Sequence, residues 1–144
     1  MPRPAKVLLI DDEPHVILFL RGILKQLGVQ TVWEAGDATD AFEKVAASKP
    51  DVVLLDLNLP AVDGFQVLEK LKAEHPNLPV IIVSAQGTLK TFNRVRELGA
   101  EGYVLKYSPK SEVLQMISDI FDRLAGRPAD EAAGEAEKPA TPPA

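Results

Sequence analysis

Hydrophobic and polar residues follow two different periods along the chain. Short runs rich in β-branched residues and leucine indicate strands, and they occur at Val7–Ile10, Thr31–Trp33, Val52–Leu55, Val80–Val83 and Gly102–Leu105. Their first residues are 24, 21, 28 and 22 positions apart, which is too far for β-hairpins. Runs that are apolar throughout, such as Val52–Leu55, are typical of strands buried on both faces, as in a parallel sheet.

The stretches between these runs have helical spacing with start and stop signals. Pro14 suits a first helical turn, Gly28 suits a C-terminal stop, and Asp37 is a candidate N-cap. The expected helices begin at Pro14, span Ala38–Ser48, Phe65–Glu74 and Leu89–Leu98, and open at Ser108-Pro109. The pattern predicts (βα)5, an open three-layer α/β sandwich. A solenoid is the rival architecture, but the units share no motif beyond their periodicity.

Composition changes at Gly126. From Gly126 to Ala144 the chain has four prolines, six alanines, four acids, two bases and no aliphatic residue larger than alanine. Such a segment does not bury enough apolar surface to offset the entropy of ordering. We therefore expect a folded domain over residues 1–125 and a disordered tail over 126–144, either an inert end or a linker.

Charge and cysteine content exclude several classes of protein. The net charge of −5 and the pI near 5.0 disfavour direct binding of nucleic acid, which needs clustered basic residues. The absence of cysteine excludes a disulfide scaffold and a thiolate metal site. No apolar run approaches the roughly 18 residues of a membrane span, and no secretory signal is recognisable. These features indicate a cytoplasmic protein without membrane contact.

Residues with chemical function follow the predicted strands. Asp11 and Asp12 follow the first, Asp56 the third, Ser84 the fourth and Lys106 the fifth. In open parallel sheets, ligands bind where the carboxyl ends of the strands meet. Carboxylates gathered there repel one another, so a hard cation such as Mg²⁺ is expected among them. With a lysine and a hydroxyl opposite, Asp56 is a candidate nucleophile for a phosphoryl group.

Four pieces of the sequence, in this order, resemble the receiver domain of two-component response regulators. They are Leu8-Leu9-Ile10-Asp11-Asp12-Glu13-Pro14, Asp56-Leu57-Asn58-Leu59-Pro60 with Asp63-Gly64, Val83-Ser84-Ala85, and Gly102-Tyr103-Val104-Leu105-Lys106. The resemblance covers about residues 5–125 and implies a flavodoxin-like fold with a five-stranded parallel sheet in the order 2-1-3-4-5.

The resemblance also implies a role for each matching acid and base. Asp56 is expected to be the phosphoacceptor, phosphorylated by a sensor histidine kinase or a histidine phosphotransfer protein in a Mg²⁺-dependent reaction. Asp12 is expected to bind Mg²⁺ directly, Asp11 mainly through water, and Asn58 through its backbone carbonyl. Lys106 is expected to pair with Asp56 and then with the phosphoryl oxygens. The chain would catalyse only its own phosphorylation and dephosphorylation, and would not otherwise be an enzyme.

A second group of residues is implied in switching and in phosphate lifetime. Ser84 is expected to reach towards the phosphoryl group, and Tyr103 to turn inward when that hydroxyl moves. Asn58 and Gln86 are expected to tune dephosphorylation, because both amides can orient a water molecule. Output is expected through protein contacts of the face formed by the fourth helix, fifth strand and fifth helix. The protein would be a monomer or a phosphorylation-dependent homodimer, acting as a stand-alone receiver.

The loop after Lys106 departs from the family pattern. Relatives usually have proline directly after this lysine, with a cis peptide bond, whereas here the order is Lys106-Tyr107-Ser108-Pro109. A cis bond costs about 3–4 kcal/mol before a residue other than proline, against under about 1 kcal/mol before proline. We therefore expect either a strained bond or a trans bond in a rearranged loop, with Lys106 still reaching Asp56. Tyr107 is a candidate partner contact.

The first expected helix is apolar on more sides than one buried face requires. With Leu20 at the centre of the core face and about 100° per residue, His15, Leu18 and Gly22 fall on the far side and Phe19 on the flank. This patch, together with Tyr107, is a candidate docking surface for a partner's helices. His15 lacks a second nitrogen ligand and is not expected to bind metal.

Four alternative functions make different demands on the sequence. An aspartate-dependent phosphatase of the haloacid dehalogenase class needs a second acid two positions after the nucleophile, where Asn58 stands. An FMN-binding flavodoxin needs a glycine- and hydroxyl-rich loop after the first strand, where acids stand. A pseudo-receiver adaptor that is not phosphorylated, and a receiver fragment of a longer regulator, remain open.

Overall fold

Strands and helices alternate along the chain in a computed structural model that describes residues 4–126. The strands are β1 (Lys6–Ile10), β2 (Thr31–Ala35), β3 (Val52–Asp56), β4 (Val80–Ser84) and β5 (Gly102–Leu105). The helices are α1 (Pro14–Gln26), α2 (Ala38–Ser48), α3 (Gly64–Glu74), α4 (Leu89–Glu97) and α5 (Lys110–Ala125). Every predicted strand and helix forms, and the boundaries agree to within two residues.

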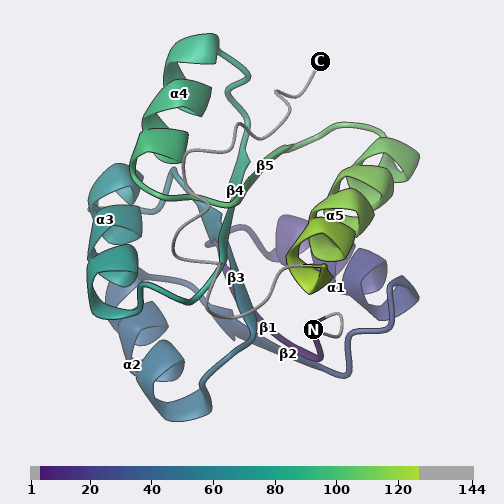
Figure 1. Cartoon of the computed structure of the whole chain (residues 1–144), viewed down its shortest axis with the longest axis horizontal. Helices are drawn as coiled ribbons and strands as arrows, with labels where there is room; N and C mark the ends of the chain where they lie inside the picture. Colours follow the sequence, from purple (N-terminus) through teal and green to yellow (C-terminus); the bar gives the residue numbers. More distant parts are fainter. Residues whose placement is uncertain (1–3, 127–144) are drawn as a thin grey trace.

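All strand pairs are parallel, and the sheet has the order β2-β1-β3-β4-β5. Helices α1 and α5 cover one face of this sheet, and α2, α3 and α4 cover the other (Figure 1). The predicted (βα)5 three-layer sandwich is therefore confirmed, and so is the strand order that the resemblance implied. The carboxyl ends of the strands meet at one edge, which we call the carboxyl edge.

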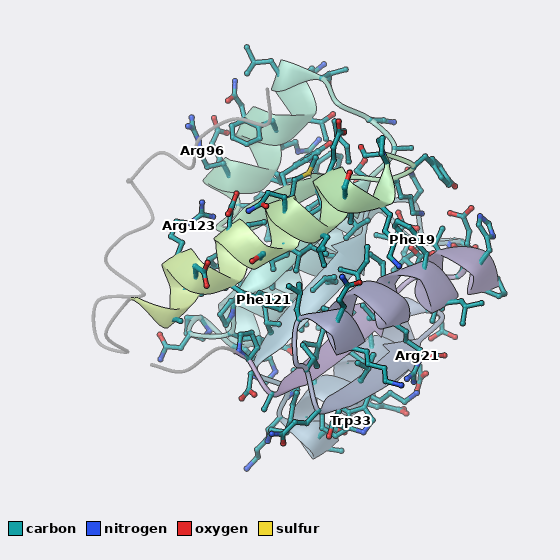
Figure 2. The ribbon with its side chains drawn as sticks, turned by 90° about the vertical axis from the view of Figure 1, so that its right-hand side faces the viewer. Phe19, Arg21, Trp33, Arg96, Phe121 and Arg123 are labelled. Carbon is teal, nitrogen blue, oxygen red and sulfur yellow. The ribbon has the colours of Figure 1, made fainter. Side chains whose placement is uncertain are left out.

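The core consists of two apolar clusters, one on each face of the sheet. Alternate residues of the strands supply them, so that Leu54 packs on the side of α1 and α5 whereas Leu55 packs on the side of α2, α3 and α4. In Figure 2, α1 and α5 lie side by side, with Phe121 between them. β3 is buried at all five positions because it lies between two strands and two helical layers. The continuous apolar run that predicted this strand reflects that burial.

Local signals in the sequence stop and start the helices as predicted. The Asp37 carboxylate accepts a hydrogen bond from the Asp40 amide at 2.8 Å and caps α2. Gly28 and Gly99 follow α1 and α4 with φ of +90° and +99°, in the left-handed region that favours glycine.

Helix α1 buries the predicted face. Val16, Leu20, Ile23 and Leu24 are buried, whereas the Leu18 side chain is 73% exposed. His15 and Gly22 are also exposed, and Phe19 is half-buried. The sides assigned from the helical period are therefore confirmed.

The segment between Asp56 and α3 is fixed by a close backbone approach. The Asp63 carboxylate caps α3 by accepting from the Phe65 amide at 2.9 Å. A Cβ atom added at Gly64 would lie 2.3 Å from the backbone oxygen of Leu57. Only a residue without a side chain allows α3 to start so close to the chain that leaves Asp56, and this approach holds the end of β3 in place.

Nearly all of the predicted tail, residues 127–144, lies outside the described residues, so the division of the chain at residue 125 stays a prediction. Within residues 4–126, none of the helices has both the length and the apolar character that crossing a bilayer requires.

Substitution of two helical glycines, one closely packed and one in open space, tests this close approach. Gly64→Ala is expected to lower the free energy of unfolding by more than about 2 kcal/mol, because the backbone has to move. Gly22→Ala is the matched control, since an added Cβ meets nothing within 4 Å there. It is expected to raise stability by up to about 1 kcal/mol through helix propensity. Urea unfolding measures both, and equal effects would contradict the close approach.

Candidate phosphorylation site

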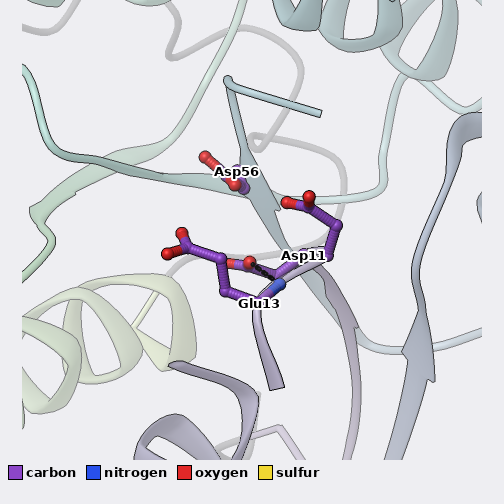
Figure 3. Close-up of side chains that lie close together, drawn as sticks. Asp11, Glu13 and Asp56 are labelled. Atoms are coloured by element: carbon purple, nitrogen blue, oxygen red, sulfur yellow. Dashed lines mark hydrogen bonds between the residues drawn. The ribbon is translucent and has the colours of Figure 1, made fainter. Parts of the chain in front are cut away.

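Four carboxylates meet at the carboxyl edge. Asp11, Asp12, Glu13 and Asp56, which we call the acidic cluster, each have an oxygen within 4.8 Å of the others. Figure 3 shows three of these side chains converging from the loop after β1 and from the end of β3. β1 and β3 are neighbours in the sheet, and their pairing runs as far as Ile10 and Leu55, which brings the residues that follow them, Asp11 and Asp56, close together. Asp11 and Asp56 are buried and Asp12 is exposed.

Asp11 has one oxygen that is short of partners. Its Oδ1 accepts a hydrogen bond from the Glu13 amide at 2.9 Å. Its Oδ2 is buried, and although it lies 3.3 Å from the Lys106 ammonium, it has no partner in hydrogen-bonding geometry. Burial raises the pKa of this carboxyl, as does the charge of Asp56, and the bond from the Glu13 amide together with the positive charge of Lys106 opposes the rise only in part. An incompletely satisfied, buried oxygen among carboxylates fits a cation ligand.

Lys106 is the positive charge at the centre of the acidic cluster. Its Nζ atom lies 2.9 Å from Asp56 Oδ2 and 2.6 Å from Glu13 Oε2, and the side chain is almost fully buried. The Lys106 amide also donates to the Ser84 carbonyl at 2.7 Å, which continues the pairing of β5 with β4. Burial by itself disfavours the ammonium, but the hydrogen bonds to Glu13 and Asp56 outweigh it, so the pKa of Lys106 is raised.

The loop from β5 to α5 has the second of the two expected forms, a trans peptide bond after Lys106 in a rearranged loop. No peptide bond among residues 4–126 is cis, and Tyr107 takes a φ of +65°. A residue other than glycine in this left-handed region costs roughly 1–2 kcal/mol. The turn places the Tyr107 hydroxyl where it donates to Glu13 Oε1 at 2.7 Å, and the ring stacks on His15 with centroids 6.4 Å apart. Lys106 nevertheless reaches Asp56, as expected.

These contacts change the pKa of both Glu13 and Tyr107. The hydrogen bonds from Lys106 and Tyr107 lower the pKa of the Glu13 carboxyl. The bond that Tyr107 donates to Glu13 raises the pKa of the phenol. Both shifts favour a carboxylate that accepts from an ammonium and a neutral phenol, which is the arrangement the structure has.

Ser84 and Tyr103 are linked through the backbone of Gln86. The Gln86 amide donates to Ser84 Oγ at 3.1 Å, and the Tyr103 hydroxyl donates to the Gln86 carbonyl. Ser84 is completely buried, and Tyr103 is 6% exposed with its ring packed against Phe92. Burial raises the pKa of the Tyr103 phenol. The two residues predicted to form a switch are therefore both hydrogen-bonded to the Gln86 backbone, and the Tyr103 side chain is buried.

The two amides predicted to tune dephosphorylation lie on either side of the site. The backbone amide of Asn58 donates to Asp56 Oδ1 at 3.0 Å, whereas the Asn58 side chain is exposed. The Gln86 side-chain oxygen accepts from the Thr91 hydroxyl at 3.3 Å. The roles of both side chains, and of the Asn58 carbonyl as a metal ligand, stay predictions.

An apolar pocket of about 260 Å³ opens beside Lys106. Val16 and Phe19 of α1, Val104 of β5 and Val113 of α5 line it, and we call it the α1 pocket. Three of the residues predicted for docking, His15, Phe19 and Tyr107, belong to its lining. Leu18 and Gly22 lie outside this lining, although both are exposed on α1.

Glu13 is the site residue that the sequence reading missed. In the sequence it is only the last residue of the acidic stretch that follows the first strand. The available signal was three consecutive acids at a strand end, but its contacts are with Lys106 and Tyr107, 93 and 94 positions away. No local pattern predicts such contacts.

Comparison with known proteins identifies the family. The profile of the response regulator receiver domain matches residues 7–118. The chain belongs to this family. Receiver domains take part in two-component signalling, in which they interact with histidine kinases or phosphotransfer proteins.

Relatives of this receiver domain include both short and long proteins. It is 35% identical over 95 residues to sporulation initiation phosphotransferase F of Bacillus subtilis, covering 66% of this chain and 76% of that protein. It is 32% identical over 121 residues to the probable transcriptional regulatory protein TcrX of Mycobacterium tuberculosis, covering 84% of this chain and 51% of that protein. The chain thus spans only about half of TcrX, and it spans 33% of another regulator that it matches, YesN of Bacillus subtilis.

Solved structures agree with this assignment. The receiver domain superposes on a chain of the CheX-CheY-BeF3-Mg+2 complex from Borrelia burgdorferi with a TM-score of 0.76 and 27% identity. The match covers 83% of this chain and 90% of that one. The two chains therefore share the fold over nearly their whole length.

Removal of the central ammonium tests the electrostatics of the site. In metal-free protein at pH 7, Lys106→Met is expected to lower the free energy of unfolding by about 3 kcal/mol, because it leaves buried carboxylates without a cation. The pKa of Lys106 is raised above its ordinary 10.5, so the stabilisation is present up to pH 10.5 while the carboxyls are ionised, and it is lost as pH rises through the folded value.

Acid pH removes the same stabilisation by protonating the carboxylates that pair with Lys106. The difference between Lys106→Met and wild type is expected to shrink as pH falls, because Asp11, whose pKa is raised, takes up a proton first and Glu13, whose pKa is lowered, takes one up later. Urea unfolding across pH measures it, with exposed Lys90→Met as the control. A difference independent of pH would contradict the charge pairing.

Proposed function

We propose that this receiver domain accepts a phosphoryl group on Asp56 from a phosphohistidine of a sensor histidine kinase or phosphotransfer protein, in a Mg²⁺-dependent reaction. The observation that carries the proposal is the buried Asp56 carboxylate held 2.9 Å from the Lys106 ammonium, within a cluster of further carboxylates. A buried aspartate paired with lysine at the end of a central strand is oriented for attack rather than for solvation.

The chemistry asked of the protein is positioning. One Asp56 oxygen attacks phosphorus; the new O–P bond forms as the P–N bond breaks, and its electron pair returns to the imidazole nitrogen. The Asn58 amide and the Lys106 ammonium hold the two carboxylate oxygens. This orients the nucleophile before the donor arrives. Lys106 also provides positive charge where the phosphoryl oxygens come to lie.

The acidic cluster fits a magnesium ion. Asp11, Asp12 and Asp56 supply oxygen ligands, which Mg²⁺ prefers, and the buried Oδ2 atom of Asp11 lacks a hydrogen-bond donor. The Asn58 carbonyl is proposed as a further ligand. The ion would neutralise charge on the transferring phosphoryl group. The solved CheX-CheY-BeF3-Mg+2 complex from Borrelia burgdorferi, one chain of which superposes on this domain, contains BeF3 together with Mg²⁺.

Output is proposed to start from Ser84. A phosphoryl group adds about −1.5 to −2 charge at the carboxyl edge, and a hydroxyl drawn towards it would disturb the bond that Ser84 accepts from Gln86. Because the same residue holds the Tyr103 hydroxyl, the change reaches β5 and the surface of α4, β5 and α5. Asn58 and Gln86 are proposed to set how readily water hydrolyses the phosphate.

Phosphorylation with a small donor tests the central claim. Wild type incubated with Mg²⁺ and acetyl phosphate is expected to gain one phosphoryl group by intact mass, labile in acid-quench assays of acyl phosphate. Asp56→Asn is expected to gain none, because an amide is not a nucleophile for this step. Chelation of Mg²⁺ is expected to abolish the gain in wild type.

The opposite result would favour a different function. If wild type gains no phosphate that depends on both Asp56 and Mg²⁺, the chain is a pseudo-receiver that acts as an adaptor. Labelling that persists in Asp56→Asn would place the phosphoacceptor elsewhere in the chain.

The α1 side of the carboxyl edge is proposed to receive the histidine-bearing helix of the donor protein. Leu18 and Tyr107 are 73% and 64% exposed, and the α1 pocket lies next to Lys106. Exposed apolar side chains beside an apolar pocket suit a helix laid into a groove. Lys106 both lines the pocket and contacts Asp56, which the donor histidine has to approach.

A charge placed on α1 tests this surface. Leu18→Glu is expected to slow phosphotransfer from a histidine-phosphorylated kinase about tenfold, a loss of about 1.4 kcal/mol. Its rate with acetyl phosphate is expected to be unchanged, because Leu18 does not touch Asp56. Leu89→Glu is the matched control, since Leu89 is 66% exposed but begins α4. Equal slowing with both donors would contradict docking at α1.

A further inference from the structure

We infer that Glu13 and Tyr107 form a positioning pair for Lys106, which holds its ammonium at the phosphorylation site independently of Asp56. This inference rests on the proposed function and adds two residues to it. Neither residue is the phosphoacceptor, and we assign neither to the metal. They act on the reaction only through the place of the Lys106 Nζ atom.

The contacts form a continuous chain between two loops. Tyr107 donates to one oxygen of Glu13 at 2.7 Å, and the other oxygen accepts from Lys106 at 2.6 Å. Glu13 lies between β1 and α1, whereas Lys106 and Tyr107 lie between β5 and α5. The Glu13 carboxylate therefore ties the two loops together across the carboxyl edge, and both of its oxygens are in use.

The conformation of Tyr107 supports a specific role. This residue is exposed, yet its backbone takes the unfavourable φ of +65° and its ring stacks on His15 with an interplanar angle of 14°. Strained backbone persists where the surrounding structure over-determines it, and such residues cluster at functional sites. Here the strained turn places the phenol on Glu13, next to the bond that holds Lys106.

A second anchor matters because the first one changes during the reaction. Lysine has a long flexible side chain, and ordering it costs conformational entropy. Asp56 fixes Nζ in the unmodified protein, but phosphorylation turns one of its oxygens into the bridging oxygen of an acyl phosphate and removes the carboxylate charge. Glu13 keeps the ammonium in place through that change and leaves donors free for a phosphoryl oxygen. Without this anchor, Lys106 has to be ordered again in each transfer.

Glu13 has a second conceivable use, since its carboxylate lies within 4.8 Å of the other acids. A metal ion bound to this carboxylate would compete with Lys106 and Tyr107 for its oxygens, whereas a positioning residue does not touch the ion. The two roles therefore differ in their effect on Mg²⁺ affinity. A positioning residue leaves this affinity nearly unchanged, and a ligand does not.

The test uses Tyr107→Phe, which removes one hydroxyl, and Glu13→Gln, which removes one charge. At saturating Mg²⁺, each is expected to slow phosphorylation by acetyl phosphate about three- to tenfold. Tyr107→Phe is expected to keep the Mg²⁺ dissociation constant of wild type. Glu112→Gln, an exposed acid in the first turn of α5, is the control and is expected to match wild type in both measurements.

Two further measurements separate positioning from a general structural effect. In a Lys106→Ala background, Tyr107→Phe is expected to cause no further slowing, because both changes act through one ammonium. In metal-free wild type, the side-chain ammonium of Lys106 is expected to give an observable NMR signal, which both single variants lose through faster motion and exchange. The NMR measurement does not depend on phosphorylation.

The outcomes distinguish this inference from the proposed function. Wild-type rates in both variants, additive slowing in the Lys106→Ala background, or an unchanged ammonium signal would each overturn the positioning pair while Asp56 phosphorylation stands. Weaker Mg²⁺ binding as the whole effect of Glu13→Gln would instead make Glu13 a ligand and overturn the pair. Wild type that is never phosphorylated would overturn the proposed function, and the ammonium signal would still decide the pair.

Discussion

One buried ammonium among carboxylates is the interaction on which the carboxyl edge depends. Without a cation, the acidic cluster at the ends of β1 and β3 would repel itself in a place where water is largely excluded. Lys106 supplies that charge from β5, on the far side of β4, and contacts Asp56, Glu13 and Asp11. The charge balance therefore requires the whole sheet in its order, because the acids and the lysine come from strands that are not neighbours.

The same geometry separates two tasks at one edge. On the side of α1 and α5, Lys106, Glu13 and Tyr107 form a charged network above the apolar α1 pocket. On the side of α4, Ser84 and Tyr103 are joined through the Gln86 backbone. Asp56 lies between them at the end of the central strand. A change of charge on Asp56 can thus affect both groups of residues, the one that holds Lys106 and the one that connects Ser84 to Tyr103 of β5.

Membership of the receiver family agrees with this arrangement of charges but does not by itself specify the output of the domain. Relatives with the same domain include a protein named as a phosphotransferase and longer proteins named as transcriptional regulators. The domain therefore occurs in proteins whose names describe different outputs. In this chain the distinctive surface is the loop after Lys106, where Tyr107 occupies a left-handed backbone conformation and contacts Glu13.

Periodicity and local signals were sufficient to predict the strands, the helices and the side chains that follow Ile10, Leu55 and Val83, since a parallel sheet gathers strand ends at one edge. Helix caps such as Asp37 were equally predictable, because their partners are three residues away. The role of Glu13 was not, since its partners lie more than 90 positions along the chain. The choice between a cis and a trans bond after Lys106 was also left to tertiary contacts. Local sequence specifies which residues lie on which element, but only the packed sheet decides which charges pair.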